Sequence, residues 1–136
     1  MSTHLKDRVE KIQQIIAKLT EASAKGTPIV VEGKKDAQAL QELGVNGAIV
    51  TVKTGGKSFL EATAELEALD APEVILFLDF DRRGKEGTKR LQQNLERLKI
   101  KANVKLWHEL QGLVGREMQC IESLPSYLST TQQKAE

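Results

Sequence analysis

The sequence predicts an α/β fold in which a parallel sheet of about four strands is covered by helices on both faces. Two observations lead to this prediction. Short apolar runs alternate along the chain with segments whose apolar residues recur at helical spacing. The runs also lack the polar–apolar alternation of a strand with one face in water, so we expect both faces of the sheet to be buried. The length of 136 residues is that of one domain.

The first segment, Ser2 to Lys25, predicts an amphipathic helix, because its apolar residues recur at helical spacing with charged residues between them. Gly26 and Pro28 end this segment. We expect residues 1–26 to pack on the domain, since an amphipathic helix beside an α/β core more often joins that core than a second subunit. A dimer contact is the alternative.

Strands and helices then alternate over residues 27–108, which we interpret as the core of the domain. The expected strands are Ile29–Val31, Ala48–Val52, Val74–Leu78 and Ala102–Leu106. The expected helices are Ala37–Leu43, closed by Gly44, then Phe59–Leu69 and Thr88–Leu98. In the second of these helices, the spacing places Leu60, Thr63, Leu66 and Leu69 on the inner face.

Residues 109–136 form a predicted C-terminal extension. Leu113 to Leu128 is expected to be helical with an interruption at Pro125, and the polar tail Ser129–Glu136 is expected to fray. This extension either closes an edge of the sheet or presents a surface to a partner, and the sequence does not decide between the two.

Charge and cysteine content exclude several classes of protein. Lys and Arg number 20 and Asp and Glu number 19, so the net charge is +1 and nucleic acid cannot be bound through bulk positive charge. Any polyanion must therefore bind a local patch. One cysteine, Cys120, excludes a disulfide framework and a cysteine-based zinc site. The sequence contains neither an apolar run of about 20 residues nor a secretory signal, which favours a cytoplasmic protein with no membrane partner.

Three carboxylates follow predicted strands directly. Glu32 follows the first strand, and Asp79 and Asp81 follow the third. If these two strands are neighbours, the acids lie on the same rim, at the carboxyl ends where open α/β sheets bind ligands. Asp79 and Asp81 are two residues apart and would point to the same side of an extended backbone. Such a group of carboxylates suits Mg²⁺ or Mn²⁺, which can orient a phosphodiester, although strand-end acids also occur simply as turn or cap residues.

Basic residues follow both acidic positions, next to predicted helix N-termini whose free N–H groups attract phosphate. We interpret these residues as phosphate or nucleic-acid contacts, with a solvated helix face as the alternative. They are Lys34, Lys35, Arg82, Arg83 and Lys85. For Lys89 and Arg90 the solvated face is favoured. Gly56-Lys57-Ser58 is similar to the end of a phosphate-binding loop, but Thr51 stands where that pattern needs glycine, so we expect only a helix start there.

Two motifs, in this order, resemble the Toprim domain that topoisomerases, primases and several nucleases share. The first is the strand-end glutamate in Val30–Asp36, and the second is the Asp-x-Asp of Phe77–Gly84, followed by a basic turn that contains glycine. The resemblance spans about Thr27 to Leu106. The sequence is most similar to small stand-alone Toprim proteins of archaea and bacteria, and to the Toprim part of the ribonuclease that matures bacterial 5S ribosomal RNA.

The resemblance implies a Rossmann-like sheet of four parallel strands and a role for each acid. Glu32 would be the general acid or base of phosphoryl transfer, and Asp79, Asp81 and Glu32 would hold Mg²⁺ or Mn²⁺. Many relatives carry an acid directly after the glycine of the turn, where this chain has Lys85. Glu86 comes one residue later, so the resemblance does not extend to it.

The resemblance further implies a magnesium-dependent protein that processes phosphodiester bonds of nucleic acid, as an RNA-directed nuclease. The alternative is a Toprim module without catalysis, which binds RNA or scaffolds a complex. RNA is favoured over DNA because the most similar relatives process RNA, and a protein partner or a homodimer stays open. A topoisomerase would need a nucleophilic tyrosine in a further domain, whereas Tyr127 is the one tyrosine here and lies near the C-terminus.

Overall fold

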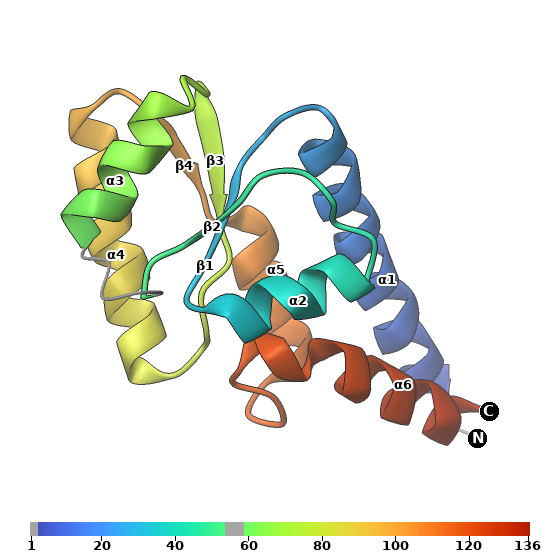
Figure 1. The fold of residues 1–136 in the computed structure, drawn as a ribbon. Helices are drawn as coiled ribbons and strands as arrows, with labels where there is room; N and C mark the ends of the chain where they lie inside the picture. The colour runs from blue at the N-terminus through green and yellow to red at the C-terminus, as the bar shows by residue number, and fades with distance from the viewer. Residues whose placement is uncertain (1–2, 54–58) are drawn as a thin grey trace.

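The computed structural model describes residues 3–53 and 59–136, and Figure 1 shows their fold. Four strands form one parallel sheet in the order β2-β1-β3-β4. Their bounds are Ile29–Val31 for β1, Ile49–Thr51 for β2, Glu73–Leu76 for β3 and Lys101–Asn103 for β4. In the register of the sheet, Val30 of β1 lies opposite Val50 of β2 and Leu76 of β3. The predicted Rossmann-like α/β fold is confirmed. Gly56-Lys57-Ser58 lies outside the described residues.

Helices cover both faces of the sheet, as Figure 1 shows. On one face lie α3, Phe59–Ala68, and α4, Arg82–Arg97. The other face carries α1, Thr3–Ala24, α2, Lys34–Glu42, and α5, Lys105–Val114. The chain ends with a short 3-10 helix, η2 at Ile121–Ser123, and with α6 at Leu124–Ala135, which packs across α1.

Each face of the sheet has its own apolar core, because alternate strand residues point to opposite sides. Val30 points toward α3 and α4, where it joins Leu66 and Leu91. Ile29 and Val31 point the other way and pack with residues of α1 and α5. Ile12 and Leu19 of α1 are fully buried in this second core, so α1 is an integral part of the same packed unit.

The structure corrects the expected boundaries after β3. The fourth strand ends at Asn103 rather than Leu106, and α5 begins at Lys105. The side-chain oxygen of Asn103 accepts a hydrogen bond from Lys105 N–H at 2.9 Å, so Asn103 turns the chain from strand into helix. Leu106 therefore lies in a helix. Leu60 of α3 and Leu69, which follows the end of α3, are exposed rather than on the inner face.

The C-terminal extension also differs from its prediction. The chain leaves α5 at Gly115, which adopts a φ of 58°, and no single helix joins Leu113 to Leu128. Pro125 stands in the first turn of α6, where its missing N–H costs nothing, and does not interrupt a helix. The expected frayed tail is wrong, because α6 continues to Ala135 and buries Thr131 and Ala135. None of the described helices is both long and apolar enough to cross a membrane.

Candidate functional site

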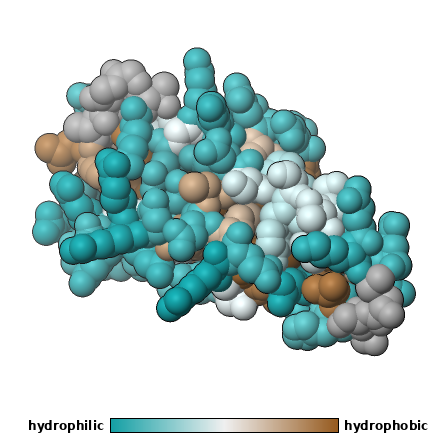
Figure 2. Space-filling view, turned by 90° about the horizontal axis from the view of Figure 1, so that it is seen from below, coloured by the Kyte–Doolittle hydropathy of each residue, from teal (hydrophilic) through white to brown (hydrophobic). Residues whose placement is uncertain are grey.

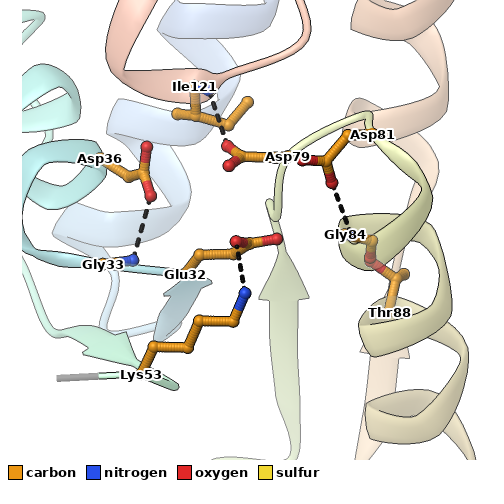
Figure 3. A network of polar contacts seen from close by, with 9 residues as sticks. All are labelled: Glu32, Gly33, Asp36, Lys53, Asp79, Asp81, Gly84, Thr88 and Ile121. Atoms are coloured by element: carbon orange, nitrogen blue, oxygen red, sulfur yellow. Dashed lines mark hydrogen bonds and ion pairs between the residues drawn. The ribbon is translucent and has the colours of Figure 1, made fainter.

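The acidic residues gather at the carboxyl ends of β1 and β3, which are neighbours in the sheet. Glu32 follows β1, and Asp79 lies three residues beyond the end of β3. Because β1 and β3 pair in parallel, both side chains lie on the same rim, as the strand-end argument anticipates. Figure 3 shows them together with Asp36 and Asp81. In Figure 1 this rim lies at the lower end of the sheet.

Glu32 is buried, with 9% of its surface exposed, and its two carboxyl oxygens have different surroundings. Oε2 lies 3.0 Å from the Nζ atom of Lys53, which follows β2 on the adjacent strand end. Oε1 is buried and has no hydrogen-bond partner among the described residues. An unpartnered buried carboxylate oxygen is costly, so this atom is placed to receive a proton or to contact a cation.

Asp79 is also buried, with 8% of its surface exposed. Its Oδ1 atom accepts a hydrogen bond from Ile121 N–H at 2.9 Å. Burial raises the pKa of Asp79 to about 7; the nearby carboxylates add to this shift, and the hydrogen bond from Ile121 opposes it. Without a cation nearby, Asp79 therefore holds a proton at mildly acidic pH that an ordinary aspartate has lost.

Asp81 is the N-cap of α4, and its Oδ1 atom accepts a hydrogen bond from Gly84 N–H at 2.8 Å. Asp79 instead turns toward Ile121, so the two carboxylates do not point to the same side (Figure 3). The expectation of a shared direction is wrong because β3 ends at Leu76, and strand alternation does not extend to Asp79 and Asp81.

Asp36 is a fourth carboxylate at this rim, and the sequence argument gave it no role. Its Oδ2 atom accepts from Gly33 N–H and its Oδ1 atom from Glu122 N–H, both at 3.0 Å. Burial raises the pKa of Asp36, while these two hydrogen bonds oppose that shift. Asp36 thus closes the first turn of α2 and ties it to the C-terminal part of the chain.

Residues 119–122, which we call the strap, form hydrogen bonds with the residues of the acidic rim. The strap donates N–H groups to Asp79 and Asp36, and the Gln119 carbonyl accepts from Phe80 N–H at 2.7 Å. Below it, the Trp107 indole donates to the Leu78 carbonyl at 2.6 Å. The C-terminal extension therefore completes the site as well as covering the core.

Gly84 allows the start of α4 to approach the rim closely. A Cβ atom at this position would collide with the Asp79 carbonyl oxygen and would lie 3.0 Å from Glu32 Oε1. The hydroxyl of Thr88 donates to the Gly84 carbonyl at 2.7 Å and fixes the first turn of the helix. The glycine of the Asp-x-Asp turn is therefore required by packing.

The predicted basic residues are distributed around this rim rather than inside it. Lys34, Lys35 and Lys85 are exposed. The Arg82 side chain is 91% exposed and forms an ion pair with Glu86 at 3.1 Å. Glu86, the acid that follows Lys85, is therefore engaged in an ion pair on the helix surface. Arg83 lines a pocket between α4 and the end of β2, together with Lys53.

The residues at the rim fit a divalent cation as an open site. No three His, Cys, Asp or Glu side chains within residues 3–53 and 59–136 form a ready metal-binding group. Mg²⁺ does not need such a cage, because it binds through one or two carboxylates and keeps water or phosphate in its other positions. Glu32 Oε1 is the unpartnered oxygen that such an ion would contact, and Asp79 follows the neighbouring strand β3 on the same rim.

Two site residues were missed by the sequence argument, and one signal was available for each. Lys53 is the second residue after β2, and the strand-end rule applied to β2 points to this part of the chain. Asp36 stands at the third helical position, where an acid reaches back to the preceding backbone. The donors Ile121 and Glu122 are far away in sequence, and the sequence gives no signal for them.

The comparisons with known proteins agree with this architecture. The Toprim domain family matches residues 27–107. The UPF0292 protein MJ1624 of Methanocaldococcus jannaschii is 39% identical over 121 residues, which cover 88% of this chain and 91% of that protein. The UPF0292 protein PF1724 of Pyrococcus furiosus is 36% identical over 118 residues, 87% of this chain and 84% of that protein.

A solved structure described as a putative protein from Aquifex aeolicus has the same fold, with a TM-score of 0.68 and 24% identity. The superposition covers 81% of this chain and 94% of that one. The family match supports a function that involves a metal and nucleic acid. With a family match over most of its core and relatives similar along nearly their full length, the chain belongs to the Toprim domain family, among the small archaeal UPF0292 proteins.

Proposed function

We propose that this chain is a divalent-metal-dependent nuclease of the Toprim family, that it acts on phosphodiester bonds, and that RNA is its substrate. The observation that carries the proposal is the pair of buried carboxylates at one rim, Glu32 with an unpartnered Oε1 and Asp79 beside it. A buried carboxylate oxygen without a hydrogen-bond partner is costly, which favours a chemical role for Glu32 over a purely structural one.

The residues of the chain divide the work. Glu32 is the general acid or base, and it holds or releases a proton at Oε1, while Lys53 keeps its Oε2 atom in place. Asp79 and Asp81, with Glu32, are the oxygens offered to Mg²⁺ or Mn²⁺. The bound ion supplies charge stabilisation on phosphate oxygens. The N–H groups of Ile121 and Gly84 orient the two aspartates.

The exposed basic residues around the rim are the proposed contacts to the nucleic-acid backbone. Their chemistry suits phosphate. The face of the molecule seen in Figure 2 is mostly hydrophilic. The proposed contacts are Lys34, Lys35, Arg82, Arg83 and Lys85. The choice of RNA over DNA follows from the similarity to RNA-processing Toprim proteins.

The test is a cleavage assay with a labelled structured RNA and a matching DNA duplex, each with Mg²⁺, with Mn²⁺ and with EDTA. Glu32→Gln and the double variant Asp79→Asn with Asp81→Asn should both abolish metal-dependent cleavage. Glu96→Gln is the matched control, because it makes the same change at an exposed acid of α4 away from the rim. Cleavage that persists in both site variants would contradict the proposal.

A second candidate is a Toprim module that binds RNA without cleaving it. One observation favours this candidate, namely the ion pair that already engages Glu32 through Lys53. This module would bind RNA with a salt-dependent affinity that Glu32→Gln leaves largely unchanged. Retained binding without cleavage by the wild-type protein would select this candidate.

A further inference from the structure

A small cationic pocket lies beside the acidic rim, between α4, the start of α3 and the end of β2. Its volume is about 180 Å³. It is lined by Lys53, Phe59, Arg83, Glu86, Gly87 and Arg90. Pockets that hold a complete small-molecule ligand usually measure about 300–1,000 Å³. This pocket therefore suits one group of a larger ligand better than a free cofactor.

In the part of the chain that the structure describes, the acidic residue of the pocket lining has an ion-pair partner, whereas its arginines do not. Among the described lining residues the acid is Glu86, which pairs with Arg82 outside the pocket lining. Among the described residues, Arg83 and Arg90 have no carboxylate partner. The pocket therefore presents two arginines whose charge is not neutralised by a protein acid. Arginine can contact a phosphate through two parallel N–H groups.

Packing holds one of these arginines in a defined position. The guanidinium carbon of Arg90 lies 4.7 Å from the centre of the Phe59 ring, within the range of a cation–π contact. The ring can approach α4 because residue 87 is glycine, and a Cβ atom there would lie 3.2 Å from the Phe59 ring edge. Arg90 is thus oriented before any ligand arrives, which reduces the entropy lost on binding.

The pocket also adjoins the carboxyl group proposed for catalysis. Lys53 lines the pocket, and its Nζ atom lies 3.0 Å from Glu32 Oε2. The Lys53 side chain would therefore lie between Glu32 and a ligand group in the pocket. A strand with one phosphodiester at the rim would then bring a neighbouring phosphate to the pocket.

We propose that this pocket binds a backbone phosphate of the nucleic-acid strand, adjacent to the phosphodiester that reaches Glu32, through Arg83 and Arg90. The assignment rests on the proposed function only in that the strand must lie across this rim. The assignment also gives the path of the bound strand across the rim. The pocket lies on the α3 and α4 side of the sheet, whereas Lys34 and Lys35 begin α2 on the other side. It also gives a binding role to Arg90, which the sequence pattern assigned to a solvated face.

The test measures binding alone, so that it does not depend on cleavage. Fluorescence anisotropy with a short labelled RNA hairpin that carries single-stranded flanks gives the affinity in EDTA at several salt concentrations. Loss of one phosphate contact lowers the slope of log affinity against log salt by about 0.7–0.9, or about five- to eightfold in affinity at about 0.1 M salt. The double variant Arg83→Ala with Arg90→Ala removes the proposed contact to this one phosphate, so its slope should fall by about 0.7–0.9 in total.

The control is Lys89→Ala with Arg97→Ala, which removes two positive charges from exposed positions of the same helix outside the pocket. Arg90→Lys keeps the charge but cannot form the bidentate contact, and its affinity should lie between those of wild type and Arg90→Ala. Equal losses in the pocket and control double variants, or no binding by the wild-type protein, would overturn the proposal. Melting curves of all variants confirm that they are folded.

This design separates the two proposals. Cleavage by the wild-type protein together with unchanged binding by the pocket variant refutes the pocket and leaves the nuclease. Weakened binding by the pocket variant in a protein that never cleaves supports the pocket and refutes the nuclease.

Discussion

Asp79→Asn should make the metal-free protein more stable at pH 8, although it removes a proposed metal ligand. The pKa of Asp79 in the folded chain is about 7 against an ordinary value of 3.8, chiefly because the carboxyl is buried. The folded state therefore keeps a proton that the unfolded state has lost between about pH 4 and pH 7. Stability falls as the pH rises through this window and then levels off. Asparagine is a neutral stand-in for the protonated acid and can still accept the hydrogen bond from Ile121.

The magnitude follows from the difference between the two pKa values. About three pKa units correspond to about 4 kcal/mol, which is an upper limit for the gain of the variant over wild type at pH 8. Below about pH 4 the two proteins should be equally stable. With a urea dependence of about 1–3 kcal/mol per M, this upper limit corresponds to a rise of at most about 1–4 M in the unfolding midpoint of the variant at pH 8.

The assay is urea unfolding in EDTA at a series of pH values from about 4 to 8, with Glu96→Gln as the exposed-acid control. Asp36 also has a raised pKa, so both proteins should lose stability with rising pH, and the difference between them isolates Asp79. A difference between variant and wild type that is the same at pH 5 and pH 8 would refute the reasoning.

Three further predictions concern the packing that supports the rim. Gly84→Ala should destabilise the fold by about 1–3 kcal/mol, because the new methyl group meets the Asp79 carbonyl, and its urea midpoint should fall below that of wild type. Trp107→Phe leaves the buried Leu78 carbonyl without its donor and should cost about 1–3 kcal/mol in the same measurement; an unchanged midpoint would mean that another donor replaces the indole. Ile12→Ala should cost about 2–5 kcal/mol in thermal or urea unfolding, whereas a helix that only rests on the surface would lose far less.

Much of the fold was predictable because the short apolar runs in the sequence correspond to the buried strands of the sheet. The apolar runs around Val30 and Ile75 mark buried strands, and β1 and β3 are neighbours. The boundaries failed where a polar residue decides them. Asn103 ends β4 through a side-chain hydrogen bond, although the apolar residues that follow it continue the pattern of a strand.

The prediction of a frayed tail fails because a polar average composition is compatible with a helix that buries one face. Residues 129–136 are polar on average, yet Leu128, Thr131 and Ala135 recur at helical spacing and are buried. Their partner is the helix at the opposite end of the sequence, since α6 packs on α1. Such long-range contacts leave only a weak mark in a single sequence.

The candidate site was predictable in its strand-end acids and not in their surroundings. Glu32 and Asp79 follow apolar strands, and the strand-end rule places them on one rim. The directions of the carboxylates depend on backbone donors, Gly84 for Asp81 and Ile121 for Asp79. Ile121 lies 42 residues from Asp79 along the chain, and no local pattern connects them.

The position of the strap near the C-terminus determines when the acidic rim becomes ordered during synthesis. Synthesis proceeds from the N-terminus, so the four carboxylates leave the ribosome well before residues 119–122. Until the strap has emerged and docked, Asp79 and Asp36 lack the N–H groups of Ile121 and Glu122. A nascent chain therefore carries the acids without the donors that set their directions.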